Sequence, residues 1–332
     1  MDTQLSKDQA LDLALKTLIA SGATEENAMP LANGIIQAEI DGIKSHGFHY
    51  LPIYCLHLSC KKVRGDASPK KNHKSNVALS VDADNGFAHR AISIGFEDLI
   101  PSAKENGIAS LAISNSYNCG VLGYHTKTIA DENLIGIGFT NAPASIAPLG
   151  GIKPVIGTNP FSVAIKSGGS VKILIDQSAS VVAKSEIAVR AKSGESIPTG
   201  WAFGPDGKDT TDPSIALKGT MAPSGGYKGF GVGLFVEIMA ACLTGSNLGI
   251  DASSFADDTG GPPGTGQFFI AINPEKFSNN FDDKIINLIN AVENQENARV
   301  PGAKRIKNAK INSNSPITIK EDLYNKILSL QS

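Results

Sequence analysis

The amino-acid sequence predicts a mixed α/β fold with a helical N-terminal region and a sheet that is not a Rossmann domain. In the first 60 residues, apolar side chains recur every three or four positions, which is typical of amphipathic helices. From Val77 onward, short strand-like segments alternate with helical patterns, as in a mixed sheet. The glycine-rich segment 228–233 has the spacing GxGxG and follows a loop instead of a strand, so it is not a Rossmann fingerprint. It still predicts a turn that feeds a helix, where Lys228 and backbone amides suit a phosphate.

The N-terminal region is expected to contain three helices. Residues 6–9, Ser-Lys-Asp-Gln, have the form of a capping box and begin the first helix, which ends at Ser21-Gly22. Thr24 is expected to cap a second helix that runs to the corner at residues 45–47. A shorter helix is expected after Pro52.

The remainder of the chain is expected to form one sheet with flanking helices. The expected strands are residues 77–81, 108–113, 135–140, 160–165, 171–175 and 267–272. The expected helices are residues 91–103, 126–133, 283–292 and 321–330, with a basic loop at 299–305. The domain boundaries that follow are a helical domain over 1–75, joined by the C-terminal segment 280–332, and a large α/β domain over 76–279. The polar segment 61–75 would connect the two domains on the surface.

Composition excludes several classes of protein. The 332 residues are 41% hydrophobic and carry 30 basic against 32 acidic side chains, so neither a nucleic-acid nor a membrane-surface protein is expected. The four cysteines show no metal-ligand spacing, which predicts reduced thiols and no metal site. No signal peptide is visible, and the longest apolar run, 231–243, contains Glu237 and is too short to span a bilayer. A cytoplasmic protein is the prediction.

One short stretch concentrates the side chains that carry chemistry. Ser45, His46, His49 and Tyr50 lie within six residues, around Gly47. A helix that ends in a Ser-His-Gly turn would hold an imidazole at the edge of a rigid element, as a general acid requires. The alternative is an ordinary helix C-terminus with Gly47 as a left-handed cap and His46 favoured by the helix dipole.

Two loops are further candidates for binding. The segment 115–125 is a polar, glycine-rich connection from a strand to a helix, a usual place for a ligand in an α/β protein. Within it, Cys119 is interpreted as an inert thiol and His125 as a structural residue. In the long series of turns from 141 to 160, Thr158 could offer a hydroxyl and an amide to a carboxylate. Glu186 could orient a histidine elsewhere or lie on the surface.

Taken together, these motifs resemble one family, the malate/L-lactate dehydrogenase type of NAD(P)-dependent oxidoreductases. The family includes sulfolactate dehydrogenases and the ketimine reductases that act on Δ1-piperideine-2-carboxylate and Δ1-pyrroline-2-carboxylate. The resemblance extends from about Leu5 to Arg305. Its motifs are residues 41–47, 115–123, 157–160, 211–213, 225–229 and 300–302.

The resemblance implies a non-Rossmann dinucleotide-binding fold with a helical domain and a large α/β cofactor domain, assembled as a homodimer. It also implies roles for individual residues. His46 would be the proton donor, Ser45 would support it, and Thr158 would contact the substrate. The residues implied to lie against the cofactor are Asn118, Cys119, Gly120, Val121, Leu122, Asp176, Gln177, Ser178, Tyr227 and Lys228. Those implied to lie beside its adenosine end are Arg299, Gly302, Lys304 and Arg305.

The sequence departs from the family pattern at two positions. Four residues after the histidine, family members typically carry an arginine that holds the substrate carboxylate, whereas this chain has Tyr50. Since a phenol cannot form a bidentate ion pair, His49 and Thr158 are expected to help bind the substrate. Glu186 stands where ketimine reductases carry an aspartate paired with the histidine, which favours imine reduction. The segments 252–255 and 115–125, by contrast, are similar to members that act on hydroxy acids.

The resemblance therefore implies hydride transfer between a nicotinamide cofactor and the carbon next to a carboxylate. The substrate would be a small 2-oxo or 2-hydroxy acid or, alternatively, a cyclic 2-imino acid. Lys304 and Arg305 could pair with a 2′-phosphate, which favours NADP, with NAD possible. A rival of another class is a cofactor-binding protein without catalysis, in which Tyr50 marks lost substrate recognition.

Overall fold

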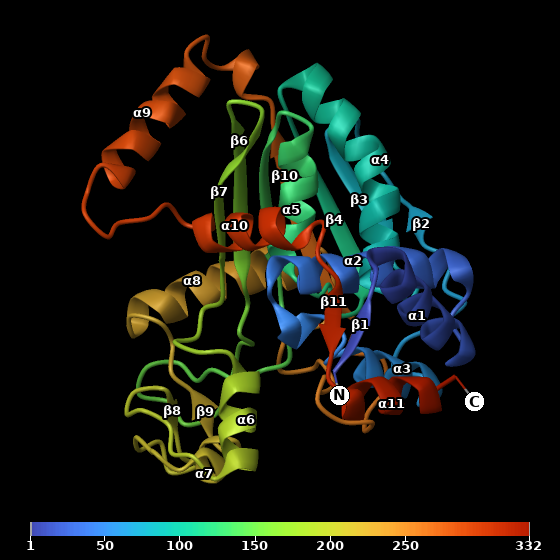
Figure 1. The fold of residues 1–332 in the computed structure, drawn as a ribbon. Helices are drawn as coiled ribbons and strands as arrows, with labels where there is room; N and C mark the ends of the chain where they lie inside the picture. Colours follow the sequence, from blue (N-terminus) through green and yellow to red (C-terminus); the bar gives the residue numbers. More distant parts are fainter. Residues whose placement is uncertain (1, 332) are drawn as a thin grey trace.

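The computed structural model describes residues 2–331 and is built around one seven-stranded mixed sheet (Figure 1). Its strands, in spatial order, are β2 (Lys70–Lys71), β3 (Ala78–Asp82), β4 (Ile108–Ser116), β10 (Thr265–Ile272), β5 (Ile135–Thr140), β6 (Phe161–Ser167) and β7 (Ser170–Gln177). Only β3 and β4 pair in parallel, and every other neighbouring pair is antiparallel. A Rossmann domain requires a largely parallel sheet. The predicted mixed α/β, non-Rossmann fold is confirmed.

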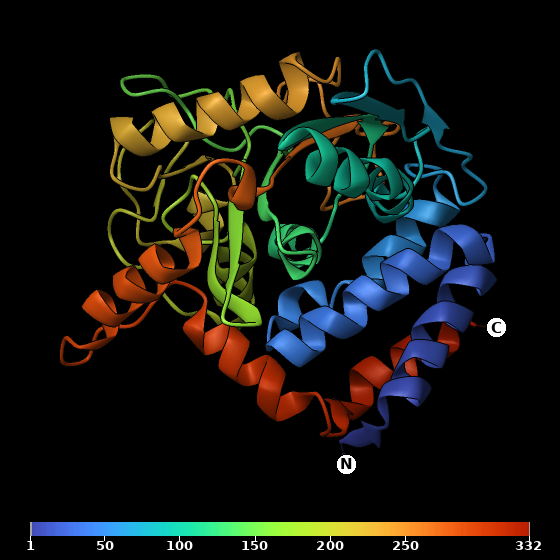
Figure 2. The same cartoon turned by 90° about the horizontal axis from the view of Figure 1, so that it is seen from above.

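Strand β10 shows how the sheet buries two layers of helices. Successive side chains of a strand point to opposite faces. Phe269 and Ala271 pack in the core with α4 (Ala88–Asn106) and α5 (Leu122–Asp131), whereas Phe268 packs with α8 (Tyr227–Glu237) and the π-helix η2 (Ile238–Cys242). Seen from above, α8 lies on one side of the sheet and α4 and α5 on the other (Figure 2).

The N-terminal helices form their own hydrophobic core, from α1 (Lys7–Ala20), α2 (Glu25–Asp41) and α3 (Leu51–Ser59). The predicted capping box is confirmed, because the Ser6 and Gln9 side chains each accept a backbone N–H from the other residue. The expected end of the second helix was wrong. It ends at Asp41, where Gly42 adopts the left-handed conformation at φ 79°, whereas Gly47 has φ −89° and is not a left-handed cap.

The C-terminal segment reaches both halves of the molecule. The helix α9 (Phe281–Glu293) packs against the sheet near β6, and α10 (Ala303–Asn312) contacts both α2 and β7. The strand β11 (Ile317–Ile319) pairs with β1 (Thr3–Leu5), and α11 (Glu321–Ser329) packs against α3. The expected basic loop at 299–305 was therefore wrong from Ala303 on, where a helix begins. The division into domains at residue 75 stays a prediction.

A small lobe extends from the carboxyl end of β7 (Figure 1). It contains α6 (Lys184–Ser193), β8 (Ala202–Phe203), α7 (Pro213–Ala216) and β9 (Thr220–Met221), which share a separate core cluster. Two short 3₁₀ helices, η1 (Lys44–His46) and η3 (Pro274–Lys276), complete the elements. Across residues 2–331, no helix is long and apolar enough to cross a membrane.

Candidate active site

The 3₁₀ turn η1 presents His46 beside Ser45. Ser45 Oγ lies 3.0 Å from His46 Nδ1, so the imidazole is oriented by its neighbour and its Nε2 is left for other partners. The His46 side chain is half-buried. Burial lowers the pKa of His46 below its usual value, and the positive charge of Arg305 lowers it further. Both effects favour the neutral imidazole over the charged form.

Gly47 allows the Glu39 side chain to pack closely against this turn. The Phe48 N–H donates a hydrogen bond of 2.8 Å to Glu39 Oε1, which ties the turn to the last turn of α2. A Cβ atom at position 47 would lie 2.1 Å from the same Glu39 oxygen, so a larger residue there would displace the Glu39 carboxylate and its hydrogen bond to Phe48. The Glu39 carboxylate is buried, and that burial raises its pKa. Sequence reasoning identified this glycine but assigned it the wrong structural role.

Tyr50 lies next to the His46 ring, at the position where the family pattern has an arginine. The two rings are nearly parallel, with an angle of 9° between their planes and 6.4 Å between their centroids. The Tyr50 hydroxyl donates to the Phe255 carbonyl and accepts from Asn118 Nδ2, and both hydrogen bonds are long at 3.4 Å. Burial raises the pKa of Tyr50 to about 12, so its hydroxyl remains a neutral donor.

The loop before α5 reaches Tyr50 through Asn118 and is tied to the sheet through Gly123. Asn118 Oδ1 accepts the Gly120 N–H at 2.6 Å, and the Gly123 N–H donates to Asp176 Oδ2 at 3.0 Å. His125 Nε2 lies 2.9 Å from the Cys119 carbonyl oxygen, inside the core. Burial raises the pKa of the Cys119 thiol to about 12, which agrees with an inert thiol and a structural His125.

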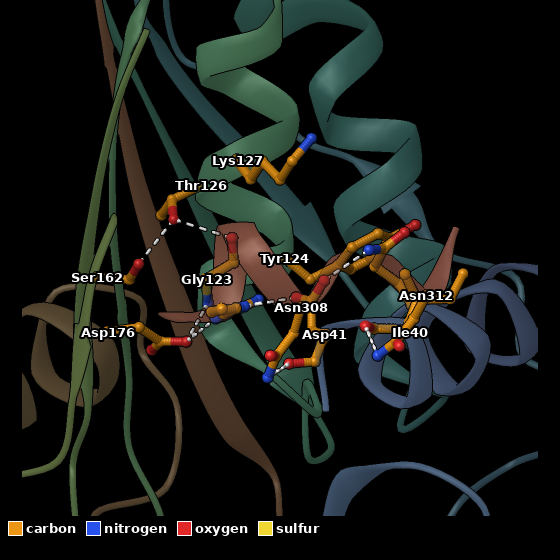
Figure 3. Close-up of polar contacts among 12 residues, drawn as sticks. Ile40, Asp41, Gly123, Tyr124, Thr126, Lys127, Ser162, Asp176, Asn308 and Asn312 are labelled. Atoms are coloured by element: carbon orange, nitrogen blue, oxygen red, sulfur yellow. Dashed lines mark hydrogen bonds and ion pairs between the residues drawn. The ribbon is translucent and has the colours of Figure 1, made fainter. Parts of the chain in front are cut away.

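Arg305 joins α10 to two carboxylates on other elements. Its Nε lies 2.5 Å from Asp41 Oδ2, at the end of α2, and its Nη1 lies 2.7 Å from Asp176 Oδ2, in β7. Figure 3 shows Asp41, Asp176 and Gly123 converging on this point. The buried Nη2 of Arg305 has no hydrogen-bond partner among residues 2–331.

A cavity of about 570 Å³ opens beside this ion-pair network. Besides Asp41, Asp176 and Arg305, it is lined by Gly42, Ile43, Leu174, Arg299, Val300, Pro301, Gly302, Ala303, Lys304 and Asn308. The fold thus brings the four residues expected beside the adenosine end of a cofactor together with Asp176. Arg299 and Lys304 are exposed, so their charges are available to an anion.

A second group of expected residues gathers where β7 ends. The Thr158 carbonyl accepts the Ala179 N–H at 2.7 Å, and the Ser224 N–H donates to the Ala179 carbonyl at 2.8 Å. This contact places Thr158 and Ser178 near the loop that leads into α8. Tyr227 and Lys228 lie exposed at the start of that helix, and Gln177 is exposed as well.

Two expected residues lie apart from the His46–Tyr50 pair. His49 is exposed and lines a small cavity with Glu39, Lys44 and Lys320. Glu186 forms an ion pair of 3.2 Å with Arg190 on its own helix, and that guanidinium lies over the Trp201 ring. Among residues 2–331, Glu186 forms no hydrogen bond or ion pair with His46, and the side chain that orients His46 is Ser45.

Comparison with known proteins decides the family. The model of the malate/L-lactate dehydrogenase family matches residues 5–328, nearly the whole chain. The chain belongs to the malate/L-lactate dehydrogenase family. The predicted family and the predicted class of enzyme, an oxidoreductase, are confirmed by this match and by the relatives below.

The relatives are named for two kinds of activity, dehydrogenases of hydroxy acids and reductases of cyclic imino acids. The chain is 39% identical over 305 residues to a (2R)-3-sulfolactate dehydrogenase (NADP(+)) of Chromohalobacter salexigens, covering 92% of this chain and 91% of the relative. It is 34% identical over 331 residues to a Δ1-pyrroline-2-carboxylate reductase of Ancylobacter novellus, covering 98% and 97%. The solved Δ1-piperideine-2-carboxylate reductase of Pseudomonas syringae pv. tomato superposes with a TM-score of 0.93 at 29% identity, covering 99% of each chain.

Sequence reasoning missed a buried carboxylate in this family member. Glu237 accepts from the Gly249 N–H at 2.6 Å and from Asn159 Nδ2 at 2.6 Å. It therefore holds the turn that carries Thr158. Its one signal in the sequence is its position as the single acidic residue in the longest apolar run, 231–243.

Proposed function

We propose that the protein is an NADP(H)-dependent oxidoreductase that transfers hydride to or from the carbon next to a carboxylate in a small 2-oxo or 2-hydroxy acid. The observation that carries the proposal is the oriented, half-buried His46 of the Ser45–His46 pair. Its neighbour Tyr50 is hydrogen-bonded to Asn118, in the loop whose Gly123 N–H donates to Asp176 at the wall of a cation-lined cavity. The proton donor and the cofactor cavity are thus parts of one connected structure. The sulfolactate dehydrogenase relative supports a 2-oxo acid as substrate.

The proposed cofactor is NADP, with NAD as a weaker alternative. The cavity beside α10 suits a phosphorylated nucleoside, because Arg299 and Lys304 are exposed at its wall and Arg305 has an unpaired Nη2. A relative named as NADP(+)-dependent supports this choice. The nicotinamide supplies the hydride when bound, and this chain supplies the proton and the binding groups.

The proposed roles divide between proton transfer and substrate binding. His46 donates a proton to the oxygen that becomes the hydroxyl, a role commonly worth about 10²–10⁴-fold in rate. Ser45 orients the imidazole through Nδ1. Thr158 would bind the substrate carboxylate. The Tyr50 hydroxyl would join it by turning its single hydrogen from the Phe255 carbonyl to the substrate, with His49 in a supporting position. A direct role for Glu186 requires its Arg190 ion pair to open.

Reduction of a cyclic 2-imino acid is the alternative reaction. It is favoured by the acid at position 186, by the pyrroline-2-carboxylate reductase relative and by the superposition on the piperideine-2-carboxylate reductase. The same residues would act, because His46 would donate its proton to the developing amine. The difference lies in the substrate, which a single set of assays can decide.

We further propose a homodimer in the cytoplasm. Support comes from α8 and η2, whose outer surface exposes apolar side chains, namely Val232, Leu234, Phe235 and Ile238. Such a patch on a water-facing helix is typical of a subunit contact. The proposed domains remain residues 1–75 with 280–332, and residues 76–279 for the cofactor.

The deciding experiment measures oxidation of NADPH and of NADH with a panel of 2-oxo acids and cyclic 2-imino acids. Turnover of a 2-oxo acid supports the main proposal, and turnover of imino acids alone supports the alternative. Tight NADPH binding without turnover of any substrate would instead establish a non-catalytic cofactor-binding protein.

A further inference from the structure

A lysine outside the described site is completely buried. Lys62 follows α3 and exposes none of its surface, although it is a flexible cationic side chain that proteins normally leave in water. A buried ammonium needs an acceptor for each of its N–H groups to offset the loss of hydration. Its neighbour Lys61 is exposed and serves as a natural comparison.

The acceptors of Lys62 all come from one distant segment, residues 254–259. The ammonium donates to the carbonyl oxygens of Ser254, of Asp257 at 2.9 Å and of Thr259 at 2.7 Å. These three hydrogen bonds match the three donors of the ammonium group. The Asp257 carboxylate lies 3.8 Å away and adds an opposite charge. One side chain thus holds three backbone points of a largely exposed loop.

A buried histidine strengthens the same attachment. His57 Nε2 lies 2.9 Å from the Asp257 carbonyl oxygen, and since a carbonyl only accepts, Nε2 carries the hydrogen. In the neutral ring Nδ1 is then an acceptor, and it is hydrogen-bonded to the Tyr117 hydroxyl. Burial lowers the pKa of His57, which agrees with the neutral form.

The attached segment forms part of the wall beside His46. The Phe255 carbonyl accepts a hydrogen bond from the Tyr50 hydroxyl. The Phe255 ring packs edge-on against Tyr117, with 5.4 Å between the ring centroids. Tyr50 in turn lies parallel to the His46 ring. A continuous set of contacts therefore runs from the Lys62 ammonium through the 254–259 segment to the proposed proton donor.

We propose that Lys62 is a positioning residue that holds the segment 254–259 in the arrangement where Phe255 borders Tyr50 beside His46. The segment then forms the substrate-binding wall on the Tyr50 side of His46. This inference rests on the proposed function, because it assigns Lys62 to substrate binding in that reaction. Lys62 acts through the loop and touches neither substrate nor cofactor.

The test compares Lys62→Met, which keeps an unbranched chain of nearly the same length but removes the donors and the charge, with the matched control Lys61→Met. We expect Lys62→Met to raise KM for the accepted substrate about tenfold or more, to change kcat less than threefold and to leave NADPH affinity unchanged. Hydrogen exchange of the amides in 254–259 should rise in Lys62→Met alone. Lys61→Met should match the wild type in every measurement.

A folded Lys62→Met protein with wild-type KM overturns the proposal, even if its stability falls, because a purely structural lysine would behave in that way. If Lys62→Met does not fold, Phe255→Ala decides. It leaves the three carbonyl acceptors of Lys62 in place but removes the ring that packs the segment against Tyr117, so the wall beside Tyr50 should loosen and KM must still rise. A wild-type KM refutes the assignment. If the wild type turns over no substrate, the proposed function fails, and hydrogen exchange of 254–259 alone tests the attachment by Lys62.

Discussion

Arg305 Nη1 lies 2.7 Å from Asp176 Oδ2, and the same carboxylate oxygen accepts the Gly123 N–H at 3.0 Å. Through this one atom, α10, β7 and the start of α5 meet at the edge of the cofactor cavity. The Arg305 Nε is committed to Asp41 as well. The guanidinium is therefore paired with two carboxylates of the protein, so replacing Arg305 should affect the stability of the fold as well as cofactor binding.

The first prediction separates two neighbouring cations by their effect on cofactor binding. Lys304→Ala should weaken NADPH about tenfold and leave NADH unchanged, because an exposed ammonium would contact only the 2′-phosphate. Arg305→Ala should weaken NADPH more than NADH but weaken both. It should also destabilise the fold by about 3 kcal/mol, since it leaves two carboxylates unpaired. Fluorescence titration and thermal unfolding measure these effects; equal loss of both cofactors in both variants would refute the 2′-phosphate role.

The second prediction concerns the proton donor. His46→Ala should lower kcat by about 10²–10⁴-fold while NADPH affinity stays within about twofold of wild type, because the imidazole acts in the chemical step. His73→Ala is the matched control, since that histidine lies on the edge of the sheet, beside Asp98. Steady-state kinetics and cofactor titration give the result. Turnover retained by His46→Ala would remove the residue from the mechanism.

The third prediction is the pH dependence of the two reaction directions. Burial and Arg305 lower the pKa of His46, so the protonated form that reduction needs is lost as pH rises through a value below 6.5. The rate of reduction should therefore fall with rising pH in this range, and the rate of oxidation, which needs the neutral imidazole, should rise. Profiles of kcat/KM against pH check this, and His46→Gln should abolish the titration. A reduction rate that increases with pH would contradict the assignment.

The fourth prediction tests the residue that replaces the family arginine. Tyr50→Phe keeps the ring beside His46 but removes the hydroxyl, so one neutral hydrogen bond of about 1 kcal/mol should be lost and KM should rise about fivefold. The value of kcat should change little. Tyr324→Phe is the control, because it removes a tyrosine hydroxyl from α11, away from His46. An unchanged KM in Tyr50→Phe would show that the hydroxyl does not bind the substrate.

The fifth prediction concerns assembly. Light scattering should give twice the chain mass of 34.7 kDa for the wild type. Ile238→Lys places a charge in the exposed apolar surface of α8 and η2 and should shift the protein to the monomer. Leu328→Lys, which alters a similarly exposed side chain on α11, should remain dimeric. A monomeric wild type would refute the dimer directly.

Local patterns in the sequence determined most of the elements and the most distinctive turn. The alternation of apolar residues predicted the strand Ile135–Thr140 with its observed bounds, and Ser6 with Gln9 marked the start of α1. Six short motifs, from residues 41–47 to residues 300–302, together indicated the family because each keeps its residue types close together in the chain. Such signals depend on side chains a few positions apart, and local backbone geometry translates them directly into structure.

The tertiary structure decided which of these residues work together. Arg305 and Asp41 are 264 positions apart in the chain, and only the packing of α10 against α2 makes them an ion pair. In the same way, the buried Lys62 meets its acceptors in a loop that no local pattern connects with it. Glu186 carried the signal of a catalytic partner, yet its nearest charge is Arg190 on the same helix. Pairing between distant segments depends on how the layers pack, and that information is absent from any short stretch of sequence.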